Sequence, residues 1–202
     1  SRREGPTRKE VSSRMEENKT ARFHLNAEDA VLLVIDEQEK LMVAMDHAPQ
    51  VLKNTKLLLL AAKELGLPVL VTEQYPKGLG ATSAELLEAM PEGWTRIEKM
   101  AFDAAGPELL DKLSALGRKT VVVCGTETHV CVYQTTRSLL EQGYQVFLVQ
   151  DAVCSRFTHN YKSGLALMRE MGAVVLTAEG AVFDLLKVSG TPAFKVLSKA
   201  LK

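Results

Sequence analysis

The chain has 202 residues, of which 46% are hydrophobic, and a formal net charge of zero. This length fits one domain of three-layer size, and the zero net charge gives no electrostatic case for binding nucleic acid or an anionic membrane. No apolar run approaches the ~20 residues that span a bilayer. The first residues lack the apolar region of a secretory signal, and the three cysteines have no framework spacing. These features predict a reduced, cytoplasmic protein.

Residues 1–22 are polar, dense in charges of both signs and almost free of large apolar side chains. Such a segment buries too little surface to offset the loss of chain entropy. We therefore expect a mobile N-terminal tail, followed by a single domain over residues 23–202.

From residue 30 onward, short apolar runs alternate with longer amphipathic stretches. Runs that are apolar at successive positions are typical of strands covered on both faces. The six runs, of which the third is the weakest, are AVLLVI (30–35), PVLVT (68–72), TRIEK (95–99), TVVVC (120–124), QVFLV (145–149) and AVVLT (173–177). The stretches between them (49–66, 107–117, 129–143 and 159–172) each end in a glycine, which is common at helix C-termini. The repeated order of helix, glycine and strand predicts a doubly wound α/β sandwich with a parallel sheet of about six strands.

Three reactive side chains lie where such a sheet binds its ligands, beyond the carboxyl ends of the strands. Asp36 directly follows the first run, Lys99 ends the third, and Cys131 lies in the first turn of the helix after the fourth. Unpaired N–H groups at a helix start favour a thiolate and can hold the oxyanion formed by its attack on a carbonyl. An ammonium at Lys99 would lower the pKa of the thiol.

The positions of these three residues predict a separate role for each in a hydrolytic reaction. Asp36 takes the thiol proton, Lys99 supplies positive charge, and Cys131 attacks an electrophilic carbon to form a thioester-type intermediate that water releases. Each residue also has a structural alternative, namely a helix cap, a solvated strand end and a buried thiol, respectively. His129 lies two residues before the cysteine, a spacing at which helical neighbours do not face each other.

The segments VLLVIDEQ, EKMAFDA and GTETHVCVYQTT together resemble the isochorismatase-like cysteine hydrolases, from about residue 28 to the C-terminus. The resemblance implies a three-layer, Rossmann-like α/β/α fold with six strands and a catalytic triad of Asp36, Lys99 and Cys131. It also implies a cis peptide bond at Thr126–Glu127, which turns the Glu127 N–H toward the oxyanion beside the N–H of Cys131.

Other features place the chain within this family. The Asp-x-His and distal His metal cluster of nicotinamidases is missing, so the resemblance implies neither a metal nor another cofactor, and nicotinamide is not the expected substrate. The siderophore isochorismatases lack the nucleophilic cysteine. TEQYPKGLG and DAVCSR resemble the uncharacterised isochorismatase-domain proteins, whose substrates are largely unassigned.

Further polar residues are candidates for contacting a substrate. Glu73, Gln74 and Tyr75 follow the second run, and Thr128 and His129 enter the nucleophile helix. Ligand sites hold few precisely placed polar groups, and a polar turn is the alternative for the first three. Of the remaining cysteines, the one at 124 falls inside a strand and the one at 154 past the next, and both are expected to be structural.

The leading prediction is hydrolysis of a carbon–nitrogen bond in a small amide. The alternatives are hydrolysis of an ester or an isochorismate-like ether, and a non-catalytic family member that serves binding or assembly. A redox thiol protein is a further alternative, weakened by the lack of a C-x-x-C pair. The expected partners are a small-molecule substrate and further copies of the chain in a homo-oligomer.

Overall fold

The computed structural model describes residues 5 and 7–202, and for residues 11 and 14–18 the backbone alone. One sheet of parallel strands runs through the described residues, in the order β3-β2-β1-β4-β5-β6. The strands are β1 (Ala30–Ile35), β2 (Val69–Gln74), β3 (Thr95–Lys99), β4 (Thr120–Thr126), β5 (Gln145–Cys154) and β6 (Val174–Leu176). The predicted six-stranded parallel sheet is confirmed.

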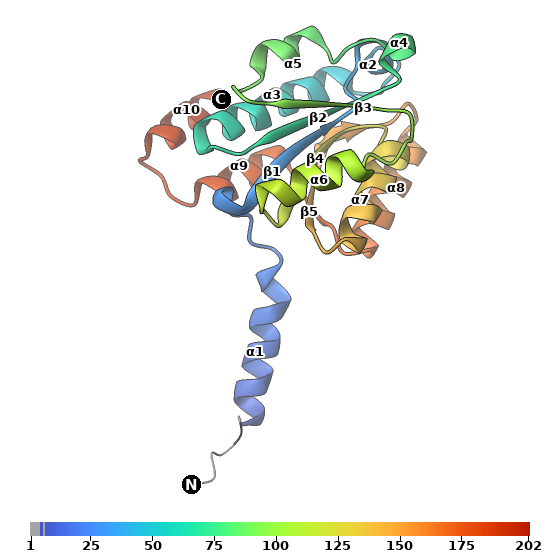
Figure 1. Cartoon of the computed structure of the whole chain (residues 1–202). Coiled ribbons are helices and arrows are strands. Elements are labelled where there is room, and N and C mark those ends of the chain that lie inside the picture. The colour runs from blue at the N-terminus through green and yellow to red at the C-terminus, as the bar shows by residue number, and fades with distance from the viewer. Residues whose placement is uncertain (1–4, 6) are drawn as a thin grey trace.

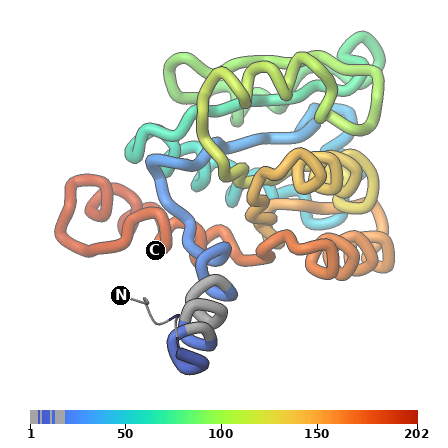
Figure 2. The backbone as a smooth tube through the Cα atoms, turned by 60° about the horizontal axis from the view of Figure 1, so that its bottom comes forward, coloured from blue at the N-terminus to red at the C-terminus, as the bar shows by residue number. Residues whose placement is uncertain are grey.

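Helices cover both faces of this sheet and complete a three-layer α/β/α sandwich (Figure 1). The helices are α1 (Arg8–Ala21), α2 (Glu39–Met42), α3 (Ala48–Leu65), α4 (Pro76–Leu79), α5 (Ala84–Ala89), α6 (Pro107–Leu116), α7 (Tyr133–Glu141), α8 (Thr158–Glu170), α9 (Ala178–Leu186) and α10 (Pro192–Ala200). Two single turns add to them, the 3-10 turn η1 (Ala27–Asp29) and the π-helical turn η2 (Thr128–Val132). Helices α6, α7 and α8 pack on one face, where α7 and α8 lie side by side (Figure 2), and α3, α5 and α9 pack on the other.

The side chains of β1 explain why its sequence is apolar at every position. Successive side chains of a strand point to opposite faces, and all six residues of β1 are buried. Ala30, Leu32 and Val34 pack in the core beneath α3 and α9. Val31, Leu33 and Ile35 pack in the core beneath α6 and α7. A continuous apolar run is therefore what a central strand with two covered faces requires.

The strand order reverses between β1 and β4, so the carboxyl ends of these two strands form the switch point at which doubly wound sheets bind ligands. Gly125, near the end of β4, has a φ of 129°, in the region that favours glycine. A Cβ atom at this position would lie 2.0 Å from the carbonyl oxygen of Ile35. The missing side chain lets the two strands approach closely beside Asp36.

Strand β5 is longer than the apolar run that predicted it. Val123 and Gly125 of β4 pair with Leu148 and Val153, so β5 carries extra residues at a bulge. Side chains bind two carbonyls of this bulge: Asn54 donates to the oxygen of Asp151 (2.7 Å), and Tyr161 donates to that of Gln150 (2.5 Å). The prediction that Cys154 lies past the strand is therefore wrong, because Cys154 is its last residue.

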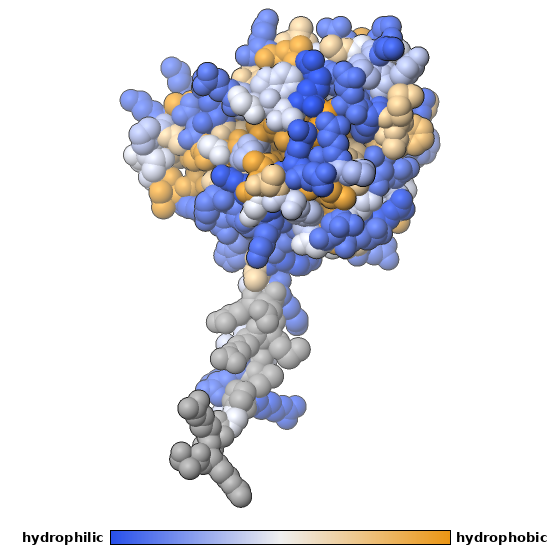
Figure 3. Space-filling model, viewed as in Figure 1, coloured by the Kyte–Doolittle hydropathy of each residue, from blue (hydrophilic) through white to orange (hydrophobic). Residues whose placement is uncertain are grey.

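The N-terminal segment contains a helix that its composition did not indicate. Helix α1 begins with a capping box, in which Thr7 and Glu10 bond to each other's backbone N–H groups. The helix extends away from the body (Figure 1), and its described side chains are mostly hydrophilic (Figure 3). Residues 1–4 and 6 of the expected tail lie outside the described residues, and the mobility of the segment stays a prediction.

Candidate active site

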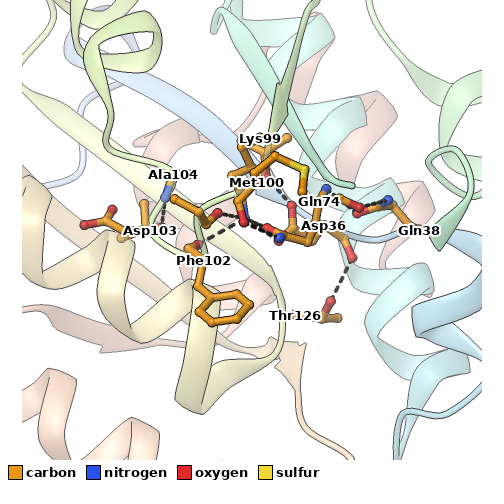
Figure 4. Close-up of polar contacts among 12 residues, drawn as sticks. Asp36, Gln38, Gln74, Lys99, Met100, Phe102, Asp103, Ala104 and Thr126 are labelled. Carbon is orange, nitrogen blue, oxygen red and sulfur yellow. Dashed lines mark hydrogen bonds and ion pairs between the residues drawn. The ribbon is translucent and has the colours of Figure 1, made fainter. Parts of the chain in front are cut away.

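The sheet brings together the three side chains that the sequence placed at strand ends. Asp36 follows β1, Lys99 is the last residue of β3, and Cys131 lies in η2, the turn after β4. Lys99 Nζ lies 2.8 Å from Asp36 Oδ2, and the two side chains are 7% and 0% exposed, respectively. A buried ion pair between Asp36 and Lys99 therefore spans the carboxyl edge of the sheet (Figure 4).

Asp36 is held on every side by the strands next to it. Its backbone has a φ of 51°, and its N–H donates to the carbonyl of Thr72 (3.1 Å). The Thr72 hydroxyl donates to Oδ1 (2.7 Å), and the Thr126 hydroxyl donates to the Asp36 carbonyl (2.7 Å; Figure 4). These bonds fix the carboxylate without solvent, so it pairs with Lys99 in one orientation.

The Lys99 ammonium has more acceptors than protons. Its acceptors are Asp36 Oδ2 (2.8 Å), Gln74 Oε1 (2.6 Å), the Ala101 carbonyl (3.1 Å) and the Phe102 carbonyl (3.0 Å). An ammonium carries three N–H donors. Lys99 therefore contributes a fixed positive charge and has no spare donor for a hydrogen bond to a substrate.

Cys131 is 7% exposed, and its thiol lies near enough to Asp36 and Lys99 for both side chains to act on its pKa. Burial, followed by the negative charge of Asp36, raises the pKa of this thiol to about 12, and the charge of Lys99 opposes the rise. Lys99 lowers this pKa, as expected, but burial and the Asp36 charge outweigh its effect. The sulfur carries its proton at neutral pH.

The peptide bond between Thr126 and Glu127 is cis, where the family resemblance implied it. Glu127 directly precedes η2, and its carbonyl accepts from the N–H groups of Val130 (3.1 Å) and Val132 (3.3 Å). The cis bond and the turn that carries Cys131 are thus one continuous piece of backbone. The use of the Glu127 and Cys131 N–H groups as an oxyanion hole stays a prediction.

Glu73 and Gln74 do not follow β2, as predicted, but are its last two residues, both buried. Glu73 Oε2 accepts from the backbone N–H and hydroxyl of Thr82 (2.7 and 2.8 Å), and Oε1 pairs with Arg96 (3.3 Å). Gln74 accepts from Lys99 and donates to the Met100 carbonyl (2.7 Å; Figure 4). Both side chains are occupied in supporting the loops around the ion pair.

Two supporting residues were missed by the sequence analysis. The amide of Gln38, which is fully buried, donates to the carbonyls of Gln74 and Gly80 (both 2.8 Å) and accepts from the Gln74 N–H (2.6 Å). Thr72 supplies the hydroxyl that holds Asp36. Polar residues at the ends of apolar runs, as in VLLVIDEQ and PVLVT, were the available signal.

The other candidate substrate contacts differ in their surroundings. Tyr75 is 46% exposed, with a φ of 36°. Thr128 is fully buried, and its hydroxyl finds no hydrogen-bond partner among the described residues. His129 Nδ1 lies 2.9 Å from Ser155 Oγ, so its ring faces the loop after β5. Thr128 is therefore the one of the three whose polar group is buried and unused.

The second carboxylate after β1 has surroundings unlike those of Asp36. Glu37 is fully buried, and Thr55 Oγ1 lies 2.8 and 2.9 Å from its two oxygens. The Cys124 thiol lies 3.8 Å away. Burial raises the pKa of Glu37 to about 8, although the bonds from Thr55 and Cys124 oppose the rise.

Within the described part of the chain, no three His, Cys, Asp or Glu side chains gather as metal ligands would. A separate search of the same residues finds no helix with the length and apolar character to cross a membrane. The expectation that no metal or other cofactor is used stays a prediction.

Residues 30–180 match the family described as the Isochorismatase domain. The secreted isochorismatase effector Isc1 of Phytophthora sojae is 40% identical over 178 residues, which cover 86% of this chain and 84% of that protein. Isochorismatase domain-containing protein 2 of Xenopus laevis is 35% identical over 178 residues, which cover 88% of this chain and 85% of that protein.

Solved structures are similar over the same part of the chain. The MAR1 ribonuclease of Caenorhabditis elegans has a TM-score of 0.85 and 36% identity, covering 88% of this chain and 92% of that one. YcaC from Pseudomonas aeruginosa, with hexane-2,5-diol and covalent acrylamide, has a TM-score of 0.79 and 27% identity, covering 88% and 91%. YcaC of Escherichia coli, described as an octameric hydrolase of unknown specificity, has a TM-score of 0.81 and 26% identity, covering 88% and 90%.

Proposed function

The chain belongs to the isochorismatase family, and from that premise we propose that it is a cysteine hydrolase that cleaves a carbon–nitrogen bond of a small amide. The observation that carries the proposal is the buried pair of Asp36 and Lys99, 2.8 Å apart, with the Cys131 thiol beside both. A buried ion pair is costly to maintain, and a nucleophile beside a base is the arrangement that covalent catalysis requires.

In the proposed first half-reaction, the sulfur of Cys131 attacks the amide carbon while its proton passes to Asp36. A concerted transfer is needed because the raised pKa keeps the resting sulfur protonated. The carbonyl oxygen becomes an oxyanion, which the N–H groups of Glu127 and Cys131 stabilise. Lys99 holds the Asp36 carboxylate in place and balances its charge before the proton arrives.

The carbon–nitrogen bond then breaks as the oxyanion returns to a carbonyl, and the leaving amine takes the proton from Asp36, which completes the first half-reaction. The second half-reaction hydrolyses the thioester. Water then attacks the thioester carbon, gives a proton to Asp36, and displaces the Cys131 sulfur, which regains that proton. The products are a carboxylic acid and an amine, or ammonia from a primary amide. Tyr75, on the exposed rim, and the unpaired hydroxyl of Thr128 are the proposed substrate contacts, with His129, Glu73 and Gln74 in support.

The relatives add support of different kinds. The YcaC of Pseudomonas aeruginosa is described with covalent acrylamide, an amide that is also an electrophile. We also propose that this chain forms a homo-oligomer, as the octameric YcaC of Escherichia coli does. We also keep as predictions that the chain binds a small molecule rather than nucleic acid and that it is cytoplasmic. Its relative Isc1 of Phytophthora sojae is described as secreted.

A screen of small primary amides for released ammonia tests the proposal. The full chain is compared with Cys131→Ala and with Cys124→Ala, which removes a buried thiol of β4. We expect release by the wild type and by Cys124→Ala, and none by Cys131→Ala. Release that persists in Cys131→Ala would refute the nucleophile and favour ether-type chemistry. Parallel assays with esters and with RNA, after the name of the Caenorhabditis elegans relative, would identify another bond as the target.

A further inference from the structure

The loop after β5 contacts the segment that contains the cis peptide bond, through hydrogen bonds from Arg156 to Glu127. The Arg156 side-chain Nε donates to both oxygens of Glu127, at 3.2 Å to Oε1 and 3.1 Å to Oε2. The Arg156 backbone N–H donates to Oε2 as well (3.0 Å). The Glu127 side chain is 13% exposed and that of Arg156 is 50% exposed. The mostly buried Glu127 carboxylate, next to the turn that carries Cys131, therefore pairs with Arg156 of the next loop. Among the described residues, Glu127 has no other ion pair.

A second contact joins the same two segments two residues further on. His129 Nδ1 lies 2.9 Å from the Ser155 hydroxyl, and burial lowers the pKa of His129. Residues 127 and 129 thus face consecutive residues of the loop after β5. The backbone between them leads directly to Cys131, and the loop therefore sets where this backbone lies.

From these contacts we propose that Arg156 is a positioning residue, which holds Glu127 in place and neutralises its carboxylate beside the developing oxyanion. This role rests on the proposed function, in which the Glu127 N–H is one of the two oxyanion donors. Arg156 touches neither the sulfur nor the substrate in this role, and it acts through Glu127.

The charge of Glu127 makes the proposal specific. An uncompensated carboxylate disfavours negative charge nearby, and water screens the Glu127 carboxylate only in part because its side chain is 13% exposed. Without Arg156, the Glu127 charge opposes the oxyanion that the adjacent N–H is meant to stabilise. Removing the Glu127 charge as well should therefore restore part of the lost rate, whereas a purely structural clamp, already broken in Arg156→Ala, would recover nothing when its second half is removed.

Two probes of the Cys131 sulfur separate oxyanion stabilisation from thiol reactivity. Attack on p-nitrophenyl acetate forms a bond from sulfur to the carbonyl carbon, passes through an oxyanion, and releases p-nitrophenolate as the carbon–oxygen bond breaks. Alkylation by iodoacetamide displaces iodide from a saturated carbon and forms no oxyanion. The burst of p-nitrophenolate and the rate of alkylation are measured for the full chain and its variants, with the modified cysteine mapped by mass spectrometry.

We expect Arg156→Ala to slow acylation by about tenfold or more, since losing one oxyanion donor costs about 10²–10³ in rate, and to change alkylation less than about twofold. Arg156→Lys should recover part of the acylation rate because it restores the charge without the arginine fork. The double variant Glu127→Gln/Arg156→Ala should acylate faster than Arg156→Ala alone. Lys56→Ala, which breaks an exposed ion pair with Glu85, should match the wild type.

Different results would overturn different statements. Unchanged acylation in Arg156→Ala, or a double variant no faster than Arg156→Ala, would refute the role of Arg156 and leave the proposed function intact. No acetyl group on Cys131 in the wild type would refute the proposed function and this role with it. If Arg156→Ala folds poorly, Arg156→Gln gives the same comparison, and its alkylation rate reports whether the site is intact.

Discussion

Two carboxylates follow β1 in immediate succession, and both are fully buried, yet their surroundings differ in kind. Asp36 faces the Lys99 ammonium and the Thr72 hydroxyl across the carboxyl edge of the sheet. Glu37 faces Thr55 of α3 and the Cys124 thiol of β4, and within the described residues it has no ion pair. The negative charge of Glu85, in α5, acts on Glu37 and raises its pKa further.

The comparison teaches that burial alone does not decide what a carboxylate does. A charge is kept in a low-dielectric site only when a partner compensates for it. The acid with a cation is suited to accept a proton from a thiol. The acid without one has its pKa raised to about 8 and keeps its own proton at neutral pH. The sequence Asp-Glu thus places the proposed base next to an acid with a raised pKa.

The largest effect is expected when the base is removed. Asp36→Asn keeps the shape of the side chain but takes no proton, so acylation of Cys131 by p-nitrophenyl acetate should fall by about 10²–10⁴-fold. The p-nitrophenolate burst measures this rate. Glu37→Gln, the same change one residue later, should acylate at close to the wild-type rate below pH 7, and equal losses in both variants would remove the distinction between the two acids.

Removing the Lys99 cation should destabilise the fold strongly, because it leaves the Asp36 charge buried without a partner. Lys99→Met should lower the free energy of unfolding by about 3–5 kcal/mol, as expected when one partner of a buried pair is removed. Urea unfolding provides the value, with Lys195→Met, an exposed lysine of α10, as the matched control. A change below about 1 kcal/mol, typical of an exposed pair, would mean that the pair of Asp36 and Lys99 is not shielded from solvent.

A pH-dependent effect is expected from the uncompensated acid. The pKa of Glu37 is raised from 4.5 to about 8 on folding, so between these values the folded state holds a proton that the unfolded state releases. Stability from this group is complete below pH 4.5 and is lost as pH rises to about 8. The Tm of the wild type should therefore fall from pH 5 to pH 8.5 relative to that of Glu37→Gln.

The control for this experiment is Glu39→Gln, which changes an exposed carboxylate two residues away. It should keep the full wild-type decline in Tm. If Glu37→Gln declines as steeply as the wild type, Glu37 is ionised in the folded protein, and the contrast with Asp36 is wrong.

The smallest effect concerns the thiol itself. Burial and the Asp36 charge raise the pKa of Cys131 to about 12, so iodoacetamide should label it slowly at pH 8 and faster as pH rises beyond the ~8.5 of a free thiol. Asp36→Asn removes one cause of the rise and should speed alkylation at pH 8 while it slows acylation. Fast labelling of the wild type at pH 7 would show a resting thiolate.

Much of the fold was predictable because a central parallel strand must be apolar on both faces. The run AVLLVI became β1 without change, and even the weak run TRIEK became β3. The bulge of β5 was not predictable, because the bonds from Asn54 and Tyr161 that hold it come from distant segments. Helix α1 carried a local signal, the capping box of Thr7 and Glu10, which its polar composition outweighed.

The proximity of the three candidate residues was predictable, and the electrostatics around them were less so. Strand ends placed Asp36, Lys99 and Cys131 at one edge, and the sheet brings them together. The net pKa shift of Cys131 depends on burial against two opposing charges, and their balance is set by tertiary distances. The contacts of Glu73 and Gln74 with the supporting loops were not predicted, because a polar residue at a strand end can point into these loops as well as into the site. Their contact with a substrate stays a prediction.

The most direct test of the catalytic assignment is to quench the reaction with p-nitrophenyl acetate early and map the acetyl group by mass spectrometry. The assignment predicts acetyl on Cys131 in the wild type, a strongly reduced yield in Asp36→Asn, and no accumulation in Cys131→Ala. Acetyl found on Cys124 or Cys154 instead, or on Cys131 with equal yield when Asp36 is replaced, would contradict it.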